Sequence, residues 1–144
     1  MARRPPRRQD PAPIFEACVH GQPVSAQTAR REALQAWKAR VRQECEAVWA
    51  GRPPLEGGVV IHVTHYYETI LGDVDNVMKP IQDALQGVVY RDDRQVSDCT
   101  GNRRNINSSF VVRYMSMPLA AAFSDGRQFL HIRVWYAPPR EELG

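Results

Sequence analysis

The sequence predicts an α+β protein in which one mixed β-sheet of about four strands carries two main helices. Segments with alternating apolar residues, typical of strands, are separated by two segments whose apolar residues recur every three or four positions, as on one face of a helix. The length of 144 residues suits one domain. A composition that is 43% hydrophobic and 24% charged excludes collagen-like and wholly disordered chains.

Residues 1–13 are expected to form a disordered basic arm, and residues 14–144 a single domain. The arm holds four arginines and four prolines without apolar periodicity, so it cannot bury enough apolar surface to offset the entropy of ordering. Its four arginines and Asp10 account for the formal net charge of +3, because the basic and acidic residues of 14–144 cancel.

A short strand and a long helix are expected first in the domain. The strand runs from Ile14 to about Val19 and ends before a Gly and a Pro. The helix is expected over Ala26–Ala50, which contains no Gly or Pro, with Ser25 as its N-cap. Its apolar residues have the spacing of one helical face: Ala33, Leu34, Trp37, Val41, Cys45 and Val48.

A second strand and a shorter helix follow. The strand is VVIHVTHYY, residues 59–67, which is rich in β-forming residues. The helix is expected from about Val77 to Gly87, with Pro80 in its first turn, where a missing N–H costs least.

The last part of the domain is expected to contain two strands around an insert. Residues 95–104 form a third strand with imperfect alternation, and residues 129–137, FLHIRVWYA, form the closing strand. Residues 105–127 form the insert, with a short helix over about Met117–Phe123. The expected order is therefore β-α-β-α-β-(insert)-β.

Several classes of protein are excluded. No apolar run reaches the ~18 residues that a membrane span needs, so we expect a cytoplasmic protein without a membrane partner. Cys18, Cys45 and Cys99 do not have the spacing of a zinc site, and their odd number favours reduced thiols. Most of the basic residues are arginines, which suits nucleic-acid binding, although a GC-rich genome gives the same bias.

Five aspartates lie close together in the sequence between the second strand and the third. Asp73 and Asp75 are two positions apart in a loop, so an extended backbone directs both carboxylates to one side. The turn after the second helix could bring Asp92 or Asp93 back to this loop. Carboxylates grouped in this way favour a hard cation such as Mg²⁺, whose remaining positions water and substrate phosphate complete.

Ordinary structural roles are an alternative for these residues. Asp75 or Asn76 could cap the second helix. Lys79 and Asp83 are four positions apart and could form a helix-surface pair worth ~0.3 kcal/mol, which is the favoured interpretation for Asp83 alone.

The same stretch has the pattern D-x-D-N-x-x-K-P-I-x-D-A-L-x-G-x-V-x-x-D-D-x-Q-V. The residues that carry it are Asp73, Asp75, Asn76, Lys79, Pro80, Ile81, Asp83, Ala84, Leu85, Gly87, Val89, Asp92, Asp93, Gln95 and Val96. This pattern resembles the signature of the RusA-type Holliday-junction resolvases, a family of crossover junction endodeoxyribonucleases. Residues 20–25, HGQPVS, are similar to the G-x-P-x-S segment of that family. The resemblance spans about residues 14–104 and the closing strand.

The resemblance implies a small homodimer that cuts four-way DNA junctions with Mg²⁺, for which Mn²⁺ is the expected substitute. Carried over by position, the metal-binding residues are Asp73, Asp75 and Asp93, and these three act in catalysis together with Lys79. A junction is recognised by its backbone shape, which makes four arginines candidate phosphate contacts. Each of them taken singly is more often a solvated surface charge; they are Arg91, Arg94, Arg103 and Arg104.

The sequence therefore predicts a Mg²⁺-dependent, structure-selective endodeoxyribonuclease that acts in DNA recombination and repair and resolves Holliday junctions by paired symmetric nicks. One alternative is a nuclease or nucleic-acid-binding protein of the same fold that is retargeted to another branched DNA or to a protein partner. A catalytically idle binding module is the second alternative, and the joint presence of Asp73, Asp75, Lys79 and Asp93 argues against it.

Overall fold

A computed structural model describes residues 12–68, 74–109, 112 and 115–138, and of residues 74–76 it describes the backbone. The elements of the described residues follow the predicted order β-α-β-α-β-(insert)-β, with the inserted segment contributing a third helix. Most of the predicted arm, residues 1–13, lies outside the described residues. In the part of the chain that the structure describes, no helix is long and apolar enough to cross a membrane.

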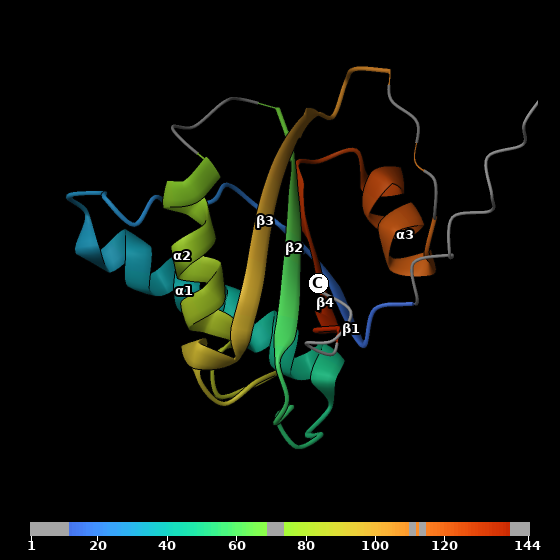
Figure 1. Ribbon diagram of the computed structural model, residues 1–144. Coiled ribbons are helices and arrows are strands. Elements are labelled where there is room, and N and C mark those ends of the chain that lie inside the picture. The colour runs from blue at the N-terminus through green and yellow to red at the C-terminus, as the bar shows by residue number, and fades with distance from the viewer. Residues whose placement is uncertain (1–11, 69–73, 110–111, 113–114, 139–144) are drawn as a thin grey trace, which may run out of the picture.

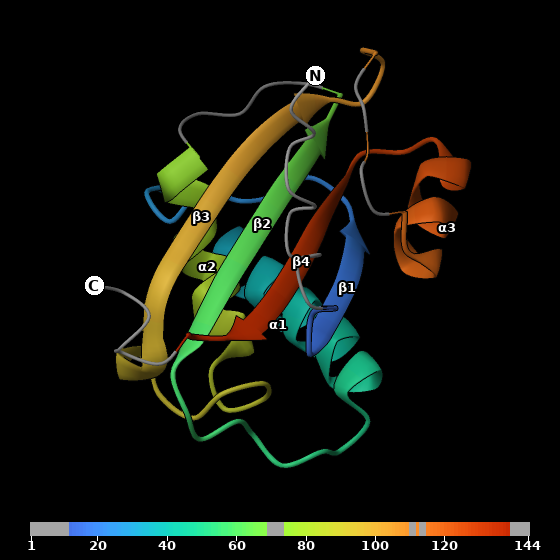
Figure 2. The ribbon, with the colours of Figure 1, turned by 45° about the vertical axis from the view of Figure 1, so that its right-hand side comes forward.

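The four strands form one mixed sheet in the order β1-β4-β2-β3 (Figure 2). Strand β1 spans Phe15–His20, β2 Val59–Tyr67, β3 Val96–Asn105 and β4 Phe129–Tyr136. The strands pair antiparallel in β1/β4 and β4/β2 and parallel in β2/β3. Because β2 and β3 are parallel, the chain must cross over between them, and α2 forms this crossover.

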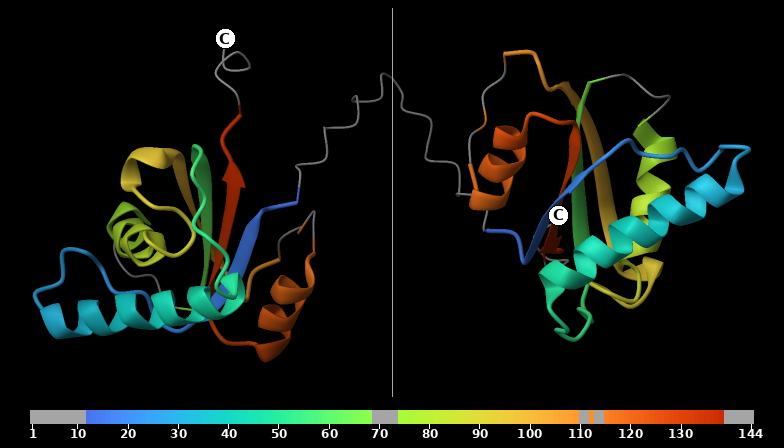
Figure 3. Two further views of the ribbon diagram at one scale, coloured as in Figure 1. Left: turned by 90° about the horizontal axis from the view of Figure 1, so that it is seen from below. Right: turned by 180° about the vertical axis from the view of Figure 1, so that it is seen from behind.

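Two helices cover one face of the sheet and the third helix lies on the other (Figures 1 and 3). Helix α1 spans Arg31–Trp49, α2 Val74–Leu85 and α3 Met117–Asp125. The main core lies between the sheet and the first two helices, and its fully buried members include Val19, Val41, Ile61, Ile81, Leu85, Ile132 and Val134. A smaller cluster of Tyr66, Leu119, Ala122 and Phe129 fixes α3 to the opposite face.

Helix α1 is shorter than the sequence predicts. It begins at Arg31, and Ser25 caps a preceding turn, in which its hydroxyl accepts a hydrogen bond from the N–H of Gln27 at 3.1 Å. A local side chain-to-backbone hydrogen bond of this kind competes with helix formation. The predicted start at Ala26 was therefore wrong, whereas the predicted apolar face is buried at Leu34, Trp37, Val41 and Cys45. At the end of the helix the prediction of Val48 on this face was wrong, because Val48 is exposed and Trp49 is buried.

Helix α2 begins earlier than predicted, and Pro80 lies inside it rather than in its first turn. A proline at this position has no N–H to donate to the carbonyl of Asn76, so one hydrogen bond of the helix is missing. The side chain of Pro80 is buried, as are the neighbouring Met78 and Ile81. Packing against the core offsets the lost hydrogen bond, and the longer helix places Asp75 in its first turn.

Candidate active site

The candidate site forms where the exposed side of α2 meets the turn that precedes β3. The Nζ atom of Lys79 lies 3.3 Å from Oδ2 of Asp93 and 3.1 Å from Oδ1 of Asp83. Oδ2 of Asp83 in turn lies 3.0 Å from Nζ of Lys38 in α1. Four side chains of alternating charge thus connect two helices and a turn, and we call this set the Lys–Asp chain: Lys38, Asp83, Lys79 and Asp93.

The segment after α2 folds back along the helix and returns Asp93 to Lys79. Gly87 has a φ of +84°, a left-handed conformation that favours glycine, and its N–H donates to the carbonyl of Tyr90 at 2.6 Å. The hydroxyl of the buried Tyr90 donates to the carbonyl of Gln82 in α2 at 2.8 Å. These contacts fix the path of the chain between Lys79 and Asp93.

Asp92 and Asp93 have different roles although they are adjacent. Asp92 is the N-cap of the 3-10 turn η1, Asp93–Gln95, and its carboxylate accepts a hydrogen bond from the N–H of Arg94 at 2.9 Å. The hydrogen bonds from Arg94 lower the pKa of Asp92 below its ordinary value. Asp93 is instead the residue whose carboxylate meets Lys79. Asp92 is therefore a capping residue, and Asp93 is the member of the pair that belongs to the site.

Gln95 anchors this turn to the rest of the molecule through four hydrogen bonds. Its Oε1 accepts from the N–H groups of Arg91 at 2.8 Å and Asp92 at 2.9 Å. Its Nε2 donates to the carbonyls of Leu55 at 2.7 Å and Gly57 at 2.9 Å. A single side chain thus fixes η1 against the segment that precedes β2.

The electrostatics of the site centre on Asp83. Burial raises its pKa, but hydrogen bonds from Lys38 and Lys79 and the charges of both lysines outweigh burial, so the pKa of Asp83 lies below its ordinary value. The pKa of Lys79 is raised, first by its hydrogen bond to Asp83 and to a lesser degree by Asp93. The carboxylate of Asp83 also lies slightly nearer to Lys79 Nζ, at 3.1 Å, than that of Asp93, at 3.3 Å.

The other two expected metal ligands are Asp73 and Asp75, and the structure describes only the backbone of the second. Asp73 lies outside the described residues. Asp75 lies in the first turn of α2, four positions before Lys79, so its backbone is one helical turn from the lysine on the same side of the helix. Among the described residues, no group of three or more His, Cys, Asp or Glu side chains could hold a metal ion.

The four candidate DNA-binding arginines lie at the two ends of β3. Arg91 pairs with Glu56 at 3.1 Å and Arg94 with Asp92 at 3.1 Å, both near the start of the strand. Arg103 and Arg104 lie near its end and, being adjacent in a strand, project to opposite faces. The structure therefore does not gather these arginines into one patch.

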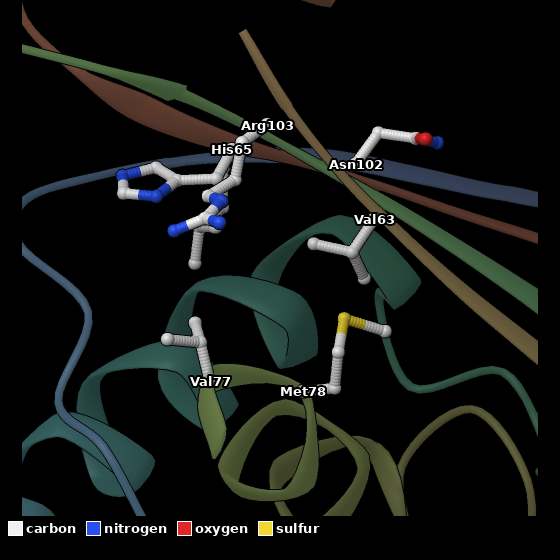
Figure 4. Close-up of a pocket in the computed structure, with 7 residues that line it drawn as sticks. Val63, His65, Val77, Met78, Asn102 and Arg103 are labelled. Atoms are coloured by element: carbon white, nitrogen blue, oxygen red, sulfur yellow. The ribbon is translucent and has the colours of Figure 1, made fainter. Parts of the chain in front are cut away.

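A small pocket lies between the ends of β2 and β3 and the first turns of α2 (Figure 4). Val63, His65, Val77, Met78 and Arg103 line it, together with Asn102 and Leu130. His65 is 6% exposed. Burial lowers the pKa of His65 below its ordinary value and the charge of Arg103 acts in the same direction, while Gln128 opposes them. The lowered pKa favours the neutral imidazole, which lines the pocket beside α2.

The roles of Gln95, Asp83 and Lys38 in the site were not predicted from the sequence. The capping-box spacing of Asp92 and Gln95, D-x-x-Q, is a local signal that could have identified the anchor of the turn. The sequence favours a helix-surface pair of Asp83 with Lys79, and this i,i+4 contact is present. Its second partner, Lys38, is 45 positions away in the sequence, and no local pattern signals such a contact.

A protein family matches most of the chain. The family described as Endodeoxyribonuclease RusA matches residues 16–112, well over half of the chain. The matched region contains α1, β2, α2, β3 and the whole Lys–Asp chain, and it ends before α3 and β4. None of the curated proteins matches the sequence.

Proposed function

Because the chain belongs to the RusA family of endodeoxyribonucleases, we propose that it is a Mg²⁺-dependent enzyme that resolves Holliday junctions by paired symmetric nicks. Membership of the family supports an endodeoxyribonuclease that acts on branched DNA. The dependence on Mg²⁺, the specificity for four-way junctions and the paired nicks are our proposal.

The observation that carries the proposal is the contact of Lys79 with Asp93 at 3.3 Å. These residues are separated by 14 positions, and the fold brings them together one helical turn from Asp75. Lys79, Asp93 and the backbone of Asp75, three of the four residues that the resemblance implies for catalysis, thus lie along α2 and the adjoining turn. A set of surface charges without a common role would not require this convergence.

The donor set fits a hard divalent cation. Asp73, Asp75 and Asp93 would hold Mg²⁺ through carboxylate oxygens, the ligands that this ion prefers. Asp93, whose carboxylate pairs with the Lys79 ammonium group, would supply one of these oxygens. When bound, Mg²⁺ supplies an activated water and neutralises phosphate oxygens.

The side chains of the protein supply the remaining parts of the reaction. Lys79 is half-exposed, with 54% of its side chain accessible, so its ammonium group can approach the scissile phosphate and stabilise the charge that develops on it. Asp92 and Gln95 orient the turn that carries Asp93. In-line attack would leave a 5′-phosphate and a 3′-hydroxyl.

A homodimer is part of the proposal. A four-way junction has two-fold symmetry, and an isologous dimer would place two active sites for symmetric nicking. Sedimentation at micromolar concentration tests this: a dimer is expected, and a monomer that fully cleaves junctions would contradict it.

The decisive experiment compares DNA substrates of one sequence as four-way junction, fork, flap and linear duplex, with Mg²⁺, with Mn²⁺ and with EDTA. We expect cleavage of the junction with either metal and none with EDTA. Asp75→Asn is expected to abolish cleavage while junction binding is kept or improved, because less negative charge then faces the phosphates. Normal cleavage by this variant would show that Asp75 only stabilises the first turn of α2.

The same panel tests the retargeted alternative. Helix α3 lies beyond the matched region and on the face of the sheet opposite α2, so it could alter the choice of substrate or partner without changing the site. Preferential cleavage of forks or flaps would favour that alternative, and binding without cleavage of any substrate would contradict the proposed nuclease.

A further inference from the structure

The chain contains two lysines, and both contact the same carboxylate. Lys38 and Lys79 lie among a large excess of arginines in the sequence. Lys38 Nζ is 3.0 Å from Oδ2 of Asp83, and Lys79 Nζ is 3.1 Å from Oδ1. Each carboxylate oxygen of Asp83 thus has its own ammonium partner, one from α1 and one from α2.

Within the Lys–Asp chain, the pair of Lys79 and Asp93 is more exposed than the pair of Lys38 and Asp83. The side chains of Lys38 and Asp83 are 26% and 30% exposed, whereas those of Asp93 and Lys79 are 45% and 54% exposed. Lys38 also comes from a helix whose buried side is anchored in the core by the neighbouring Trp37 and Val41. The inner pair is therefore the fixed end of the set, and the outer pair is the end that a large substrate can reach.

We propose that Asp83, oriented by Lys38, is the positioning residue for Lys79 in the nuclease reaction. This inference rests on the proposed function. Lysine has a flexible four-carbon side chain, and holding its ammonium group in one place costs rotamer entropy. A carboxylate that is itself fixed from the other side lowers that cost before the substrate binds.

The need for a second anchor follows from the role proposed for Asp93. A carboxylate that binds a metal ion donates its electron density to that ion, which weakens its contact with a neighbouring ammonium group. Asp83 faces two lysines and is not among the expected metal ligands. Lys79 therefore keeps one contact that does not change during the reaction.

A simple helix-surface pair makes a different prediction. Exposed i,i+4 pairs contribute little to stability, and their loss has no reason to change a reaction rate. The chain offers a matched control in Arg42 and Glu46, an i,i+4 pair in α1 with Nε and Oε1 3.1 Å apart. Asp83→Asn and Glu46→Gln both remove one carboxylate charge from a helix-surface pair.

The first test measures steady-state cleavage of the preferred branched substrate with Mg²⁺. Asp83→Asn is expected to lower kcat about tenfold with KM and the melting temperature nearly unchanged, because the cation is misplaced rather than absent. Removal of a stabilising donor itself costs about 10²–10³ in kcat. Asp83→Glu should restore part of the loss, Lys38→Met should give a smaller decrease, and Glu46→Gln should match the wild type.

A double-mutant comparison tests whether Asp83 acts through Lys79. In a Lys79→Ala background, Asp83→Asn should cause no further loss of kcat, since its only target is gone. An equal fractional loss in both backgrounds, or a wild-type rate for Asp83→Asn, would overturn the proposal.

The second test does not depend on activity. Selective ¹³C labelling of the lysine Cε atoms gives two side-chain signals, which Lys38→Met and Lys79→Ala assign. We expect both signals in the wild type to differ from free lysine in shift and mobility, and Asp83→Asn to move both toward free lysine, whereas Glu46→Gln leaves them in place. Unchanged signals in Asp83→Asn would overturn the proposal. Failure of the wild type to cleave any DNA, with the signals behaving as expected, would instead reject the proposed function.

Discussion

Lys79 and Asp93 lie with Nζ and Oδ2 3.3 Å apart, although they belong to different elements of secondary structure. Lys79 is in the middle of α2, and Asp93 begins η1. The contact depends on the reversal at Gly87 and on the hydrogen bond from Tyr90 to Gln82. The site therefore depends on the segment that folds back along α2, and substitutions in that segment should lower the rate of cleavage.

The first prediction uses the same substitution at two adjacent positions. Asp93→Asn removes the charge that faces Lys79 and is expected to lower cleavage at least 10²-fold. Asp92→Asn keeps an oxygen that can cap η1, because asparagine is as good an N-cap as aspartate, and it should retain most of the activity. The measurement is cleavage of the four-way junction with Mg²⁺. Equal losses in the two variants would contradict the division of roles between Asp92 and Asp93.

The second prediction concerns the anchor of the turn. Gln95→Ala removes four hydrogen bonds, so we expect the free energy of unfolding to fall by about 2 kcal/mol. Cleavage should fall as well, because the position of Asp93 is no longer fixed. Urea unfolding measures the first effect. Gln43→Ala, at an exposed position of α1, is the control, and a Gln95→Ala variant as stable as this control would show that η1 holds its shape without the anchor.

The third prediction is a loss of stability in mild acid. Burial lowers the pKa of His65 and of His131 below the ordinary value of 6.5. For His131, the adjoining Arg133 also lowers the pKa, whereas Glu16 opposes both. The unfolded chain then binds more protons than the folded protein below pH 6.5, so the stability that is fully present above that pH is lost as the pH falls. The slope is at most about 1.4 kcal/mol per pH unit for each histidine.

Urea unfolding at several pH values between 5 and 8 tests this prediction. His131→Gln removes one titrating group while keeping a donor near Glu16, whose Oε2 lies 2.6 Å from Nε2 of His131. The pH dependence of this variant should be flatter than that of the wild type. A stability that rises on acidification would show that the ion pair with Glu16, and not burial, controls the pKa of His131.

The fourth prediction concerns the attachment of α3. Ser116 caps this helix by accepting from the N–H of Leu119, and its hydroxyl donates to Oε2 of Glu16 in β1 at 2.6 Å. Ser116→Ala is expected to lower stability by about 1 kcal/mol and to speed amide hydrogen exchange in α3 while leaving α2 unchanged. Ser124→Ala in the same helix loses only a hydrogen bond to the carbonyl of Ala120 and is the control. Equal exchange in the two variants would refute the anchoring role of Ser116.

The fifth prediction concerns residues 1–13. Their four arginines could neutralise up to four phosphates, which corresponds to a slope of about −3.6 in log K against log salt on duplex arms. Deletion of residues 1–13 should flatten the salt dependence and weaken all DNA substrates alike. Binding curves of both proteins at two salt concentrations measure this. Superimposable curves would mean that the arm does not bind DNA, and a selective loss of junction binding would mean that it recognises structure.

Much of the architecture was predictable because it depends on local periodicity. The alternation of residues 59–63 and the three-to-four spacing of Leu34, Trp37 and Val41 each indicate which side of one element is buried, whatever lies opposite. From Thr64 to Tyr66 both faces of β2 are buried, which the alternation did not predict. The short helix expected in the insert is present as α3. Local rules failed at the ends of elements: Ser25 caps a turn instead of α1, and Pro80 lies inside α2, because packing against the core compensates for its missing hydrogen bond.

The sequence by itself determined the order of the elements, their buried faces and the carboxylates and lysine of the family pattern. The tertiary structure decided that β4 lies between β1 and β2, that Asp93 rather than Asp92 meets Lys79, and that Lys38 reaches Asp83 from another helix. These outcomes depend on contacts between residues that are distant in the sequence. Such contacts form only when the whole core packs and its backbone reversals are fixed, so no single segment encodes them.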